Sequence, residues 1–424
     1  MKLNYTRTYF VGLAFLSICA FWQMYDSIIP LILQNTFGLS ETVTGVVMSA
    51  DNILALFLLP IIGSLSDKVD TKLGKRTPFI IGGTIVAIIS MMILPYAASV
   101  RNLILFVVGL GITLIAMAMY RSPAVALMPD VTPKPLRSKA NAVINFMGAI
   151  GGVYALILIS ALVKDGDNPS YLNVFVGIAV IMFISIVVLV ITTKENAIAK
   201  QIAMEYPEET KRELAKEEVP LEPKIKKSLI LILMSIFLWY MAYNAVTTAF
   251  SRYATIVWGL EGGGFADCLM VATVAAILSY IPIGIIASKY GRRKCILVGV
   301  AMMFASYMFA FTFDSYSSVI NIAFAAIGIG WAAINVNSLP MVVEMSKGSD
   351  IGKFTGLYYT FSMAAQIATP ILSGVLLQYL SYRTLFPYAA AFTAMAFVTM
   401  YMVKHGDSIP DKKDSFFDNF EIED

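Results

Sequence analysis

The chain has 424 residues, of which 58% are hydrophobic and only 14% charged, and its mean hydropathy is +0.75. Soluble domains carry about 25% charged residues, so this composition excludes a water-soluble globule. The formal net charge is +3, without a basic cluster, which argues against nucleic acid as a partner.

Histidine and cysteine usage argues against catalytic and metal sites. The single histidine, His405, lies near the C-terminus, so the body of the chain lacks the residue that most catalytic triads and zinc sites need. Cys19, Cys268 and Cys295 stand in or beside apolar stretches and are interpreted as small buried residues. We therefore expect no enzyme activity, no cofactor and no metal.

Twelve apolar stretches are long enough to cross a bilayer, which takes about 20 residues per helix. The first stretch lacks a small-residue cleavage site and is interpreted as a retained helix. The pattern predicts an all-α polytopic membrane protein with twelve transmembrane helices. The predicted spans are 9–34, 43–65, 77–98, 102–128, 140–163, 171–192, 228–250, 265–287, 294–313, 318–343, 353–379 and 384–403.

Basic residues predict the orientation of these helices, because lysine and arginine resist translocation. With the N-terminus inside, 26 of the 31 basic residues fall in inner segments. The outer segments hold only Arg101, Lys164, Arg252 and Arg383, and Arg121 alone lies within a span. We expect a multi-pass protein of the cell (cytoplasmic) membrane with both termini in the cytoplasm.

The longest polar segment, residues 193–227, carries eight basic and eight acidic residues and three prolines, as a solvated tether would. It is predicted to be a cytoplasmic linker between one six-helix bundle at 1–192 and another at 228–403. The remaining segment, 404–424, is predicted to be a solvated tail.

The two predicted bundles repeat weakly in sequence, which predicts two pseudo-symmetric halves. The landmarks recur in the same order in both halves. Trp22, Tyr25 and Asp26 match Tyr240, Tyr243 and Asn244; Gly63, Gly74, Lys75 and Arg76 match Gly284, Gly291, Arg292 and Arg293; and Asp130 matches Glu344.

The segment from Gly63 to Ile80 resembles the signature loop between the second and third helices of the major facilitator superfamily. The loop is longer than the usual signature. In this length, and in the segment from Arg121 to Asp130, the chain resembles the glycoside-pentoside-hexuronide:cation symporters, especially the sucrose/proton symporter-like branch. The resemblance implies the major facilitator fold and transport of a sugar. It also implies an inner gate of charged residues, formed by Gly63, Asp67, Lys75, Arg76, Asp130 and, through the repeat, Glu344.

The chain departs from the patterns of the family in three respects. Ser288 replaces the aspartate of the second-half signature. Ala55 and Leu59 stand where the sodium-coupled, melibiose-type members carry aspartates, and the fifth span lacks the arginine that plant sucrose symporters use. The lack of aspartate at positions 55 and 59 favours protons over sodium as the coupling ion.

Only Asp26, Asp51 and Arg121 are ionisable residues well inside spans, where a charge costs at least about 2.5 to 3.5 kcal/mol. The resemblance implies that Asp26 and Arg121 couple transport to protons. A nearby arginine holds a carboxylate ionised, whereas separation in a dry cavity favours its protonated form. The alternative is a static ion pair.

Asp51 is interpreted as a second proton site, as a cation ligand together with Asn52, or as an acid facing an aqueous vestibule.

Uncharged polar and aromatic residues recur on shared helix faces, as at Tyr240 and Asn244, spaced i, i+4. Amides bind hydroxyl groups through both donor and acceptor atoms, and aromatic faces suit a sugar ring. Helix packing is the alternative role of each residue. The predicted substrate site is formed by Trp22, Gln23, Tyr25, Tyr120, Asn145, Tyr240, Tyr243, Asn244, Trp331, Asn335, Tyr358 and Gln366.

The sequence therefore predicts a monomeric symporter that moves a neutral sugar or glycoside with protons through the bilayer by alternating access. A sodium-coupled sugar symporter is one alternative. A proton-driven exporter of amphipathic drugs is another, since 23 methionines could form an adaptable apolar cavity. A membrane sugar sensor without transport is the third.

Overall fold

The computed structural model describes residues 3–133, 136–164, 170–205, 222–345 and 351–407, which are almost entirely helical. Twelve of the described helices are long and apolar enough to cross a membrane, in agreement with the predicted all-α membrane fold. They are α1 (Tyr5–Leu31, continued by the π-helix η1, Ile32–Thr36), α2 (Glu41–Lys68), α3 (Thr77–Ser99), α4 (Leu103–Asp130), α5 (Arg137–Leu162), α6 (Leu172–Thr192), α9 (Pro223–Trp258), α10 (Phe265–Tyr290), α11 (Arg292–Phe311), α12 (Ile320–Glu344), α13 (Ile351–Tyr379) and α14 (Leu385–Tyr401, preceded by the 3-10 turn η4, Tyr382–Thr384).

The helix α9 differs most from its predicted span, because it begins at Pro223 and ends at Trp258 instead of covering 228–250. Proline at the first helical position leaves no N–H unsatisfied, and Gly259 ends the helix in the left-handed conformation, at φ +66°. Arg252 therefore lies inside α9 and is buried, whereas the charge count assigned it to an outer loop.

The chain divides into two compact units. Unit 1 contains Met1–Gly38 and Ala50–Ala215, and unit 2 contains Leu39–Ser49 and Lys216–Asp424. The helix α2 consequently begins in unit 2 and continues in unit 1.

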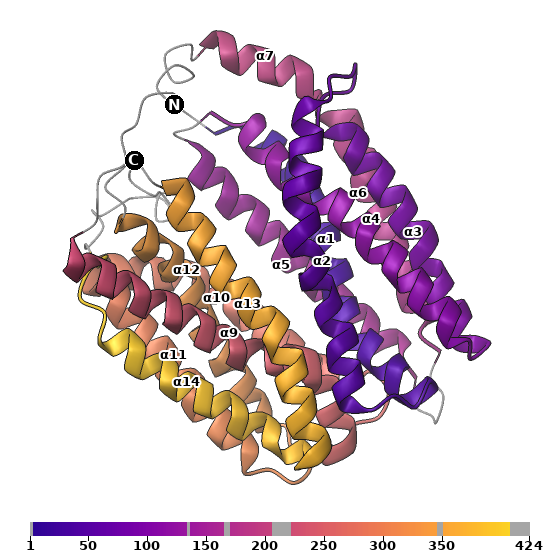
Figure 1. Ribbon diagram of the computed structural model, residues 1–424, viewed down its shortest axis with the longest axis vertical. Helices are drawn as coiled ribbons and strands as arrows, with labels where there is room; N and C mark the ends of the chain where they lie inside the picture. Colours follow the sequence, from indigo (N-terminus) through magenta and orange to yellow (C-terminus); the bar gives the residue numbers. More distant parts are fainter. Residues whose placement is uncertain (1–2, 134–135, 165–169, 206–221, 346–350, 408–424) are drawn as a thin grey trace. The chain divides into compact units, whose positions relative to one another are not determined.

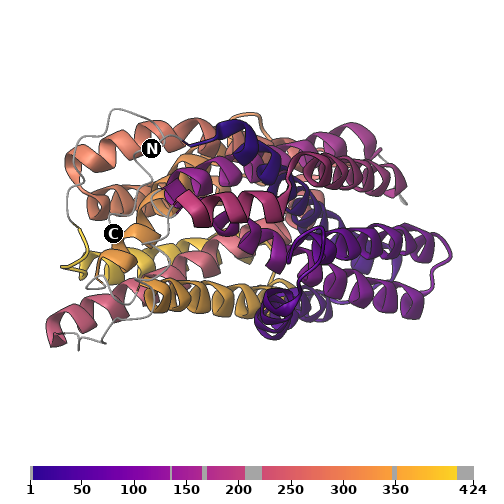
Figure 2. The same ribbon diagram turned by 90° about the horizontal axis from the view of Figure 1, so that it is seen from above.

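The helices of the two units pack in the same order. In unit 1, α1 packs against α5 and α6, and α3 packs against α4 and α6. In unit 2, α9 packs against α13 and α14, and α11 packs against α12 and α14. In both views the helices within each unit run lengthwise beside one another (Figure 1 and Figure 2). These four helix pairs of unit 1 therefore correspond to four helix pairs of unit 2.

A close contact between α1 and α5 depends on glycine at position 151. A Cβ added to Gly151 would lie 1.9 Å from the carbonyl oxygen of Leu16, which is a backbone atom that cannot rotate away. We expect Gly151→Ala to cost about 1 to 3 kcal/mol through overpacking. The measurement is the midpoint of thermal unfolding in detergent. Gly111→Ala is the matched control, because a Cβ there meets nothing within 4 Å; equal midpoints for the two variants would contradict this account.

Candidate functional site

The three ionisable residues inside spans come from three helices of unit 1. Asp26 lies on α1, Asp51 on α2 and Arg121 on α4, and all three are half-buried. Asp51 interacts electrostatically with both Asp26 and Arg121. Its Oδ1 also accepts a hydrogen bond of 2.9 Å from the side chain of Asn52. The described part of unit 1 shows no ion pair within 4.0 Å between Asp26 and Arg121. The arginine instead interacts electrostatically with Asp51.

Two aromatic side chains of α1, Trp22 and Tyr25, pack together, and Tyr25 interacts electrostatically with both acids. The rings of Trp22 and Tyr25 pack edge to face with their centroids 5.3 Å apart. Both polar ring atoms, the indole N–H and the phenol hydroxyl, are buried without a hydrogen-bond partner among the described residues. Gln23 donates a hydrogen bond of 3.3 Å to Ser27 on the same helix. Trp22 and Tyr25 therefore retain polar atoms that a bound solute could satisfy.

Two other predicted substrate residues of the first half lie in different surroundings. Tyr120 is fully buried, and its hydroxyl is 2.6 Å from Ser17 Oγ and 3.1 Å from the Ala14 carbonyl oxygen. These bonds join α4 to α1, which is the helix-packing role. Asn145 lies on α5 and is exposed.

The predicted substrate residues of unit 2 include an aromatic cluster from α9 and α12. The rings of Tyr243 and Trp331 are parallel, with their centroids 3.7 Å apart. Tyr240 meets Trp331 edge to face at 5.2 Å. The hydroxyl of Tyr240 lies 3.5 Å from that of Tyr358 on α13, which in turn lies 3.2 Å from Ser338 Oγ. The structure thus brings four predicted residues from three helices together.

The three predicted amide side chains of unit 2 differ in their hydrogen bonds and burial. Asn244 Nδ2 is buried and has no partner among the described residues. Gln366 Nε2 donates a hydrogen bond of 3.3 Å to the Ser362 carbonyl, one turn earlier in α13. Asn335 lies half-buried on α12. Asn244 is therefore the amide with an unused buried donor.

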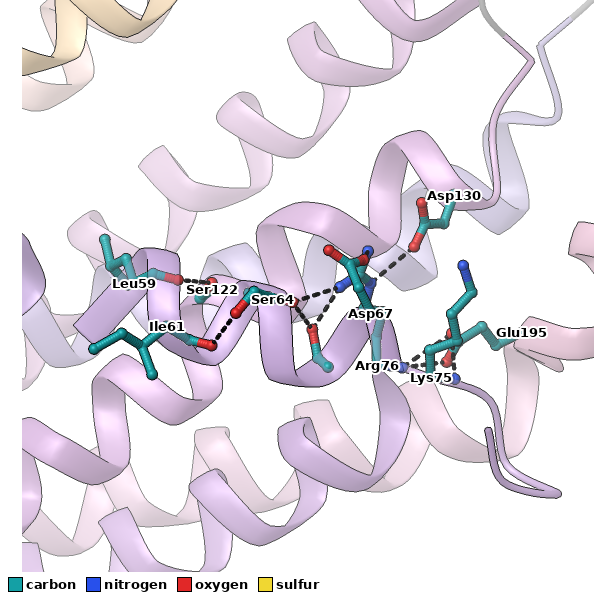
Figure 3. A network of polar contacts seen from close by, with 11 residues as sticks. Leu59, Ile61, Ser64, Asp67, Lys75, Arg76, Ser122, Asp130 and Glu195 are labelled. Carbon is teal, nitrogen blue, oxygen red and sulfur yellow. Dashed lines mark hydrogen bonds and ion pairs between the residues drawn. The ribbon is translucent and has the colours of Figure 1, made fainter. Parts of the chain in front are cut away.

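Three residues of the predicted inner gate, Asp67, Arg76 and Asp130, form a compact network centred on Arg76, which precedes α3 (Figure 3). Arg76 Nε donates a hydrogen bond of 2.8 Å to Asp130 Oδ2 at the end of α4. Its terminal nitrogens contact Asp67 Oδ1 at the end of α2 and the hydroxyl of Ser66. Burial lowers the pKa of Arg76, but the hydrogen bonds and charges of Asp130 and Asp67 outweigh this and raise it above its ordinary value. The guanidinium therefore joins the ends of α2, α3 and α4.

Glu195, at the start of the short helix α7 (Glu195–Glu205), caps α3 from outside the predicted gate (Figure 3). Its carboxylate accepts hydrogen bonds from the backbone N–H groups of Lys75 at 2.8 Å, Arg76 at 3.0 Å and Thr77 at 3.0 Å. It also accepts one of 2.8 Å from the Thr77 hydroxyl. The first N–H groups of a helix need acceptors and favour an anion. The sequence offered one signal for such a cap. Arg76, the residue before Thr77, has no side-chain acceptor for the first N–H groups of α3, so an acceptor had to come from elsewhere.

Unit 2 contains a similar network formed by different residues. Arg292 NH1 donates a hydrogen bond of 2.6 Å to Glu344 Oε2, as Arg76 does to Asp130. The backbone N–H of Arg293 donates one of 3.0 Å to Asp407 Oδ1 in the segment after α14. Asp407 thus occupies the place in unit 2 that Glu195 occupies in unit 1, at the first turn of the third helix. The side chain of Ser288 lies outside the described residues.

The side chains that most often bind metals are dispersed in the part of the chain that the structure describes. There, no three side chains among histidine, cysteine, aspartate and glutamate come together to hold a metal ion. The three cysteines are free thiols.

Twelve candidate spans, with an arginine–carboxylate network after the second span and a similar one after the eighth, are typical of the class of secondary transporters. The sequence profile of the Major Facilitator Superfamily matches residues 11–278 and 258–418, and the chain belongs to this family. It is accordingly a multi-pass membrane transporter and not an enzyme.

Three curated relatives are plant sucrose transport proteins. SUC4 of Arabidopsis thaliana is 28% identical over 147 residues, which cover 31% of this chain and 29% of SUC4. SUC3 of the same plant is 26% identical over 151 residues, covering 31% of this chain and 25% of SUC3. SUT3 of Oryza sativa subsp. indica is 25% identical, covering 31% and 30%. The similarity therefore spans less than a third of either protein.

Solved structures share the fold over nearly the whole chain. The xylose transporter XylE of E. coli, in an inward open conformation, has a TM-score of 0.71 at 15% identity and covers 99% of both chains. The nucleoside transporter NupG has a TM-score of 0.69 at 15% identity and covers 94% of this chain and 100% of that chain.

Proposed function

We propose that the protein is a symporter that couples uptake of a neutral sugar or glycoside to protons by alternating access. In this proposal it lies in the cell membrane as a monomer with both termini in the cytoplasm. The observation that carries the proposal is the electrostatically connected set of Asp26, Asp51 and Arg121 inside otherwise apolar helices. Ionisable residues at such depth need a task or a partner, and proton relays are a common task.

The coupling step follows from the electrostatic interaction of Asp51 with both other charges. Arg121 stabilises one carboxylate in its ionised form, and two nearby carboxylates resist being ionised together. The three residues therefore hold one proton more easily than none or two. Uptake of that proton by Asp26 would make its side chain neutral. The change from one access state to the other then costs less free energy, because no unpaired charge is buried in the bilayer.

The substrate class follows from the residues that the second half offers. Trp331, Tyr240 and Tyr358 supply aromatic faces and hydroxyl groups, while Asn244 has a buried donor without a partner. Such a set suits hydroxyl groups on a ring and has no charge to complement an ionic solute. The names of the plant relatives support a sugar such as sucrose.

The moving bodies in this proposal are the bundles 1–192 and 228–403, joined by the linker 193–227. The inner gate of Gly63, Asp67, Lys75, Arg76, Asp130 and Glu344 would close the cytoplasmic side in one state and separate in the other. Asp26, Asp51 and Asn52 would be the oxygen donors if sodium replaced the proton.

Purified protein in proteoliposomes tests the function. A thermal-shift screen first identifies which sugars stabilise the protein, starting with sucrose. With an inward proton gradient we expect that sugar to accumulate up to about tenfold for each pH unit and each proton coupled, since tenfold corresponds to about 1.4 kcal/mol. Liposomes without protein and a protonophore are the controls. Accumulation that follows a sodium gradient and ignores the pH gradient would overturn the coupling ion, and facilitated equilibration without accumulation would overturn symport.

A further inference from the structure

Two polar atoms on one face of α1 lack hydrogen-bond partners in the described part of unit 1. They are the hydroxyl of Tyr25 and the indole N–H of Trp22, three residues earlier, and both are buried. Residues three apart lie on the same face of a helix. An unsatisfied buried donor costs free energy, and native structures rarely keep one without a functional reason. We therefore expect both donors to have partners in another state of the protein.

The ring of Tyr25 is held by its neighbours and not by its hydroxyl. The side chain is 1% exposed, and its ring stacks on that of Phe21 with the centroids 6.1 Å apart. It also meets the ring of Trp22 edge to face at 5.3 Å. These contacts involve the rings alone, so phenylalanine at position 25 would keep them and lose only the O–H group.

The hydroxyl of Tyr25 lies in the electric field of the candidate proton site. It interacts electrostatically with Asp26 on α1 and with Asp51 on α2. Asp51 interacts in turn with Arg121 on α4. A hydrogen bond donated to a carboxylate stabilises its ionised form. A donor in this position can therefore change the proton affinity of the two acids.

The helices packed against α1 leave the two acids as the groups that decide the surroundings of this hydroxyl. These helices are α5, α6 and α4. Within its bounds α6 has no ionisable residue, and beyond its first turn α5 has only Tyr154, whose hydroxyl donates to a carbonyl of α6 at 3.0 Å. On α4, the hydroxyl of Tyr120 is bonded to another part of α1, and Arg121 interacts with Asp51.

Unit 2 carries the repeated pair without an acid. Tyr243 and Asn244 on α9 match Tyr25 and Asp26, and Asn244 Nδ2 is also buried without a partner among the described residues. Asparagine neither takes up nor releases a proton. The pair in unit 2 is therefore suited to binding a solute only, whereas the pair in unit 1 is suited to linking a solute to a proton.

We propose that the Tyr25 hydroxyl is a hydrogen-bond switch that links sugar binding to proton binding. In the empty protein it would donate to a carboxylate of Asp26 or Asp51, and in the loaded protein to an oxygen of the sugar. In the conformation described here it is bonded to neither acid. Loss of the donor to the sugar destabilises the ionised carboxylate, which then takes up a proton from water.

The switch acts equally in the other direction. Protonation of the acid pair releases the hydroxyl for the sugar, and the two affinities change by the same factor, as linkage requires. Tyr25 keeps its own proton throughout and acts through the acids, as a positioning residue. This inference rests on the proposed proton-coupled sugar transport and adds the residue that connects the two ligands.

Sugar affinity measured by calorimetric titration of the purified protein, between about pH 5 and pH 9, tests the switch. Sucrose is the first probe, replaced by another sugar if that one gives the larger thermal shift. In wild type we expect binding about tenfold tighter at the acid end, which corresponds to one hydrogen bond to a charged group. In Tyr25→Phe we expect this ratio to fall to about one. Proton uptake on addition of the sugar, followed with a pH indicator in weak buffer, should fall with it.

Two variants serve as controls. Tyr243→Phe is the matched one, because it makes the same substitution at the repeated position, next to an asparagine. Trp22→Phe removes the other unpartnered donor of the same helix face. Both are expected to lower the sugar affinity by a similar factor at every pH, so that the ratio between the acid and alkaline ends stays at the wild-type value.

The outcomes separate the switch from the transport function. A wild-type ratio of about one, a ratio that Tyr25→Phe retains, or an equal loss in Tyr243→Phe would overturn the switch. Proton-driven accumulation by wild type in proteoliposomes would then leave symport in place, whereas its absence would overturn both. Without sugar, Tyr25→Phe should unfold at or above the wild-type temperature, since it removes an unsatisfied buried group. A lower midpoint would reveal a structural bond of this hydroxyl and would also count against the switch.

Discussion

Asp26→Asn is expected to abolish accumulation of the sugar against its gradient while leaving sugar binding and counterflow exchange in place. Asparagine has a similar shape but neither takes up nor releases a proton, so the proton gradient no longer drives the cycle. Counterflow needs no net proton movement and depends only on the conformational change. Loss of coupling removes the whole driving force, which is about 1.4 kcal/mol, or tenfold accumulation, for each pH unit.

The measurement is sugar uptake into proteoliposomes under an imposed pH gradient, followed by counterflow on the same preparation. Asp51→Asn separates the roles of the two acids, because Asp51 interacts electrostatically with both Asp26 and Arg121. Asp70→Asn is the control, since Asp70 is an exposed acid in the loop after α2. Accumulation at the wild-type level in Asp26→Asn would show that this residue does not carry the coupling proton.

Arg76→Ala is expected to destabilise unit 1 by about 3 kcal/mol, because removing one partner of a buried ion pair leaves the others uncompensated. The value lies at the lower end of the range for buried pairs, because the Asp67 side chain is 58% exposed and stays solvated, whereas that of Asp130 is 27% exposed. Arg76→Lys should cost less, since it keeps the charge but lacks the planar fork that reaches Asp67 and Asp130 together.

Thermal unfolding of the purified protein measures these losses, with Lys68→Ala as the control, an exposed cation at the same end of α2. Asp130→Asn completes a double-mutant cycle with Arg76→Ala and isolates the energy of that pair. An unfolding midpoint for Arg76→Ala equal to that for Lys68→Ala would contradict a central role for the guanidinium.

Local chemistry made the helices predictable. About 20 apolar residues in a row must be helical in a bilayer, because no water is there to satisfy the backbone, so the twelve spans follow from hydropathy. Their ends were less predictable at α9, where Arg252 and the polar residues around it suggested a loop. The carboxylate of Glu41, more than 200 positions away in the chain, compensates that charge and allows the helix to continue through it.

In the candidate gate, too, the sequence predicts some contacts and leaves others to the tertiary structure. Asp67, Arg76 and Asp130 belong to a recognisable motif, and the structure brings them together. Glu195 was counted among the linker charges, because nothing near it in the chain indicates which helix end it caps. Likewise, sequence reasoning paired Arg121 with Asp26 and did not indicate that Asp51 interacts electrostatically with both.

The sequence by itself determined that the chain is a twelve-helix membrane transporter built as a repeat, because hydropathy, charge bias and the repeated motif are properties of short segments. Only the tertiary structure decided which charges meet: Glu195 with the first turn of α3, and Glu41 with Arg252. The physical reason is that a buried charge is stabilised by groups within a few ångströms, and helix packing alone brings residues distant in sequence to that separation.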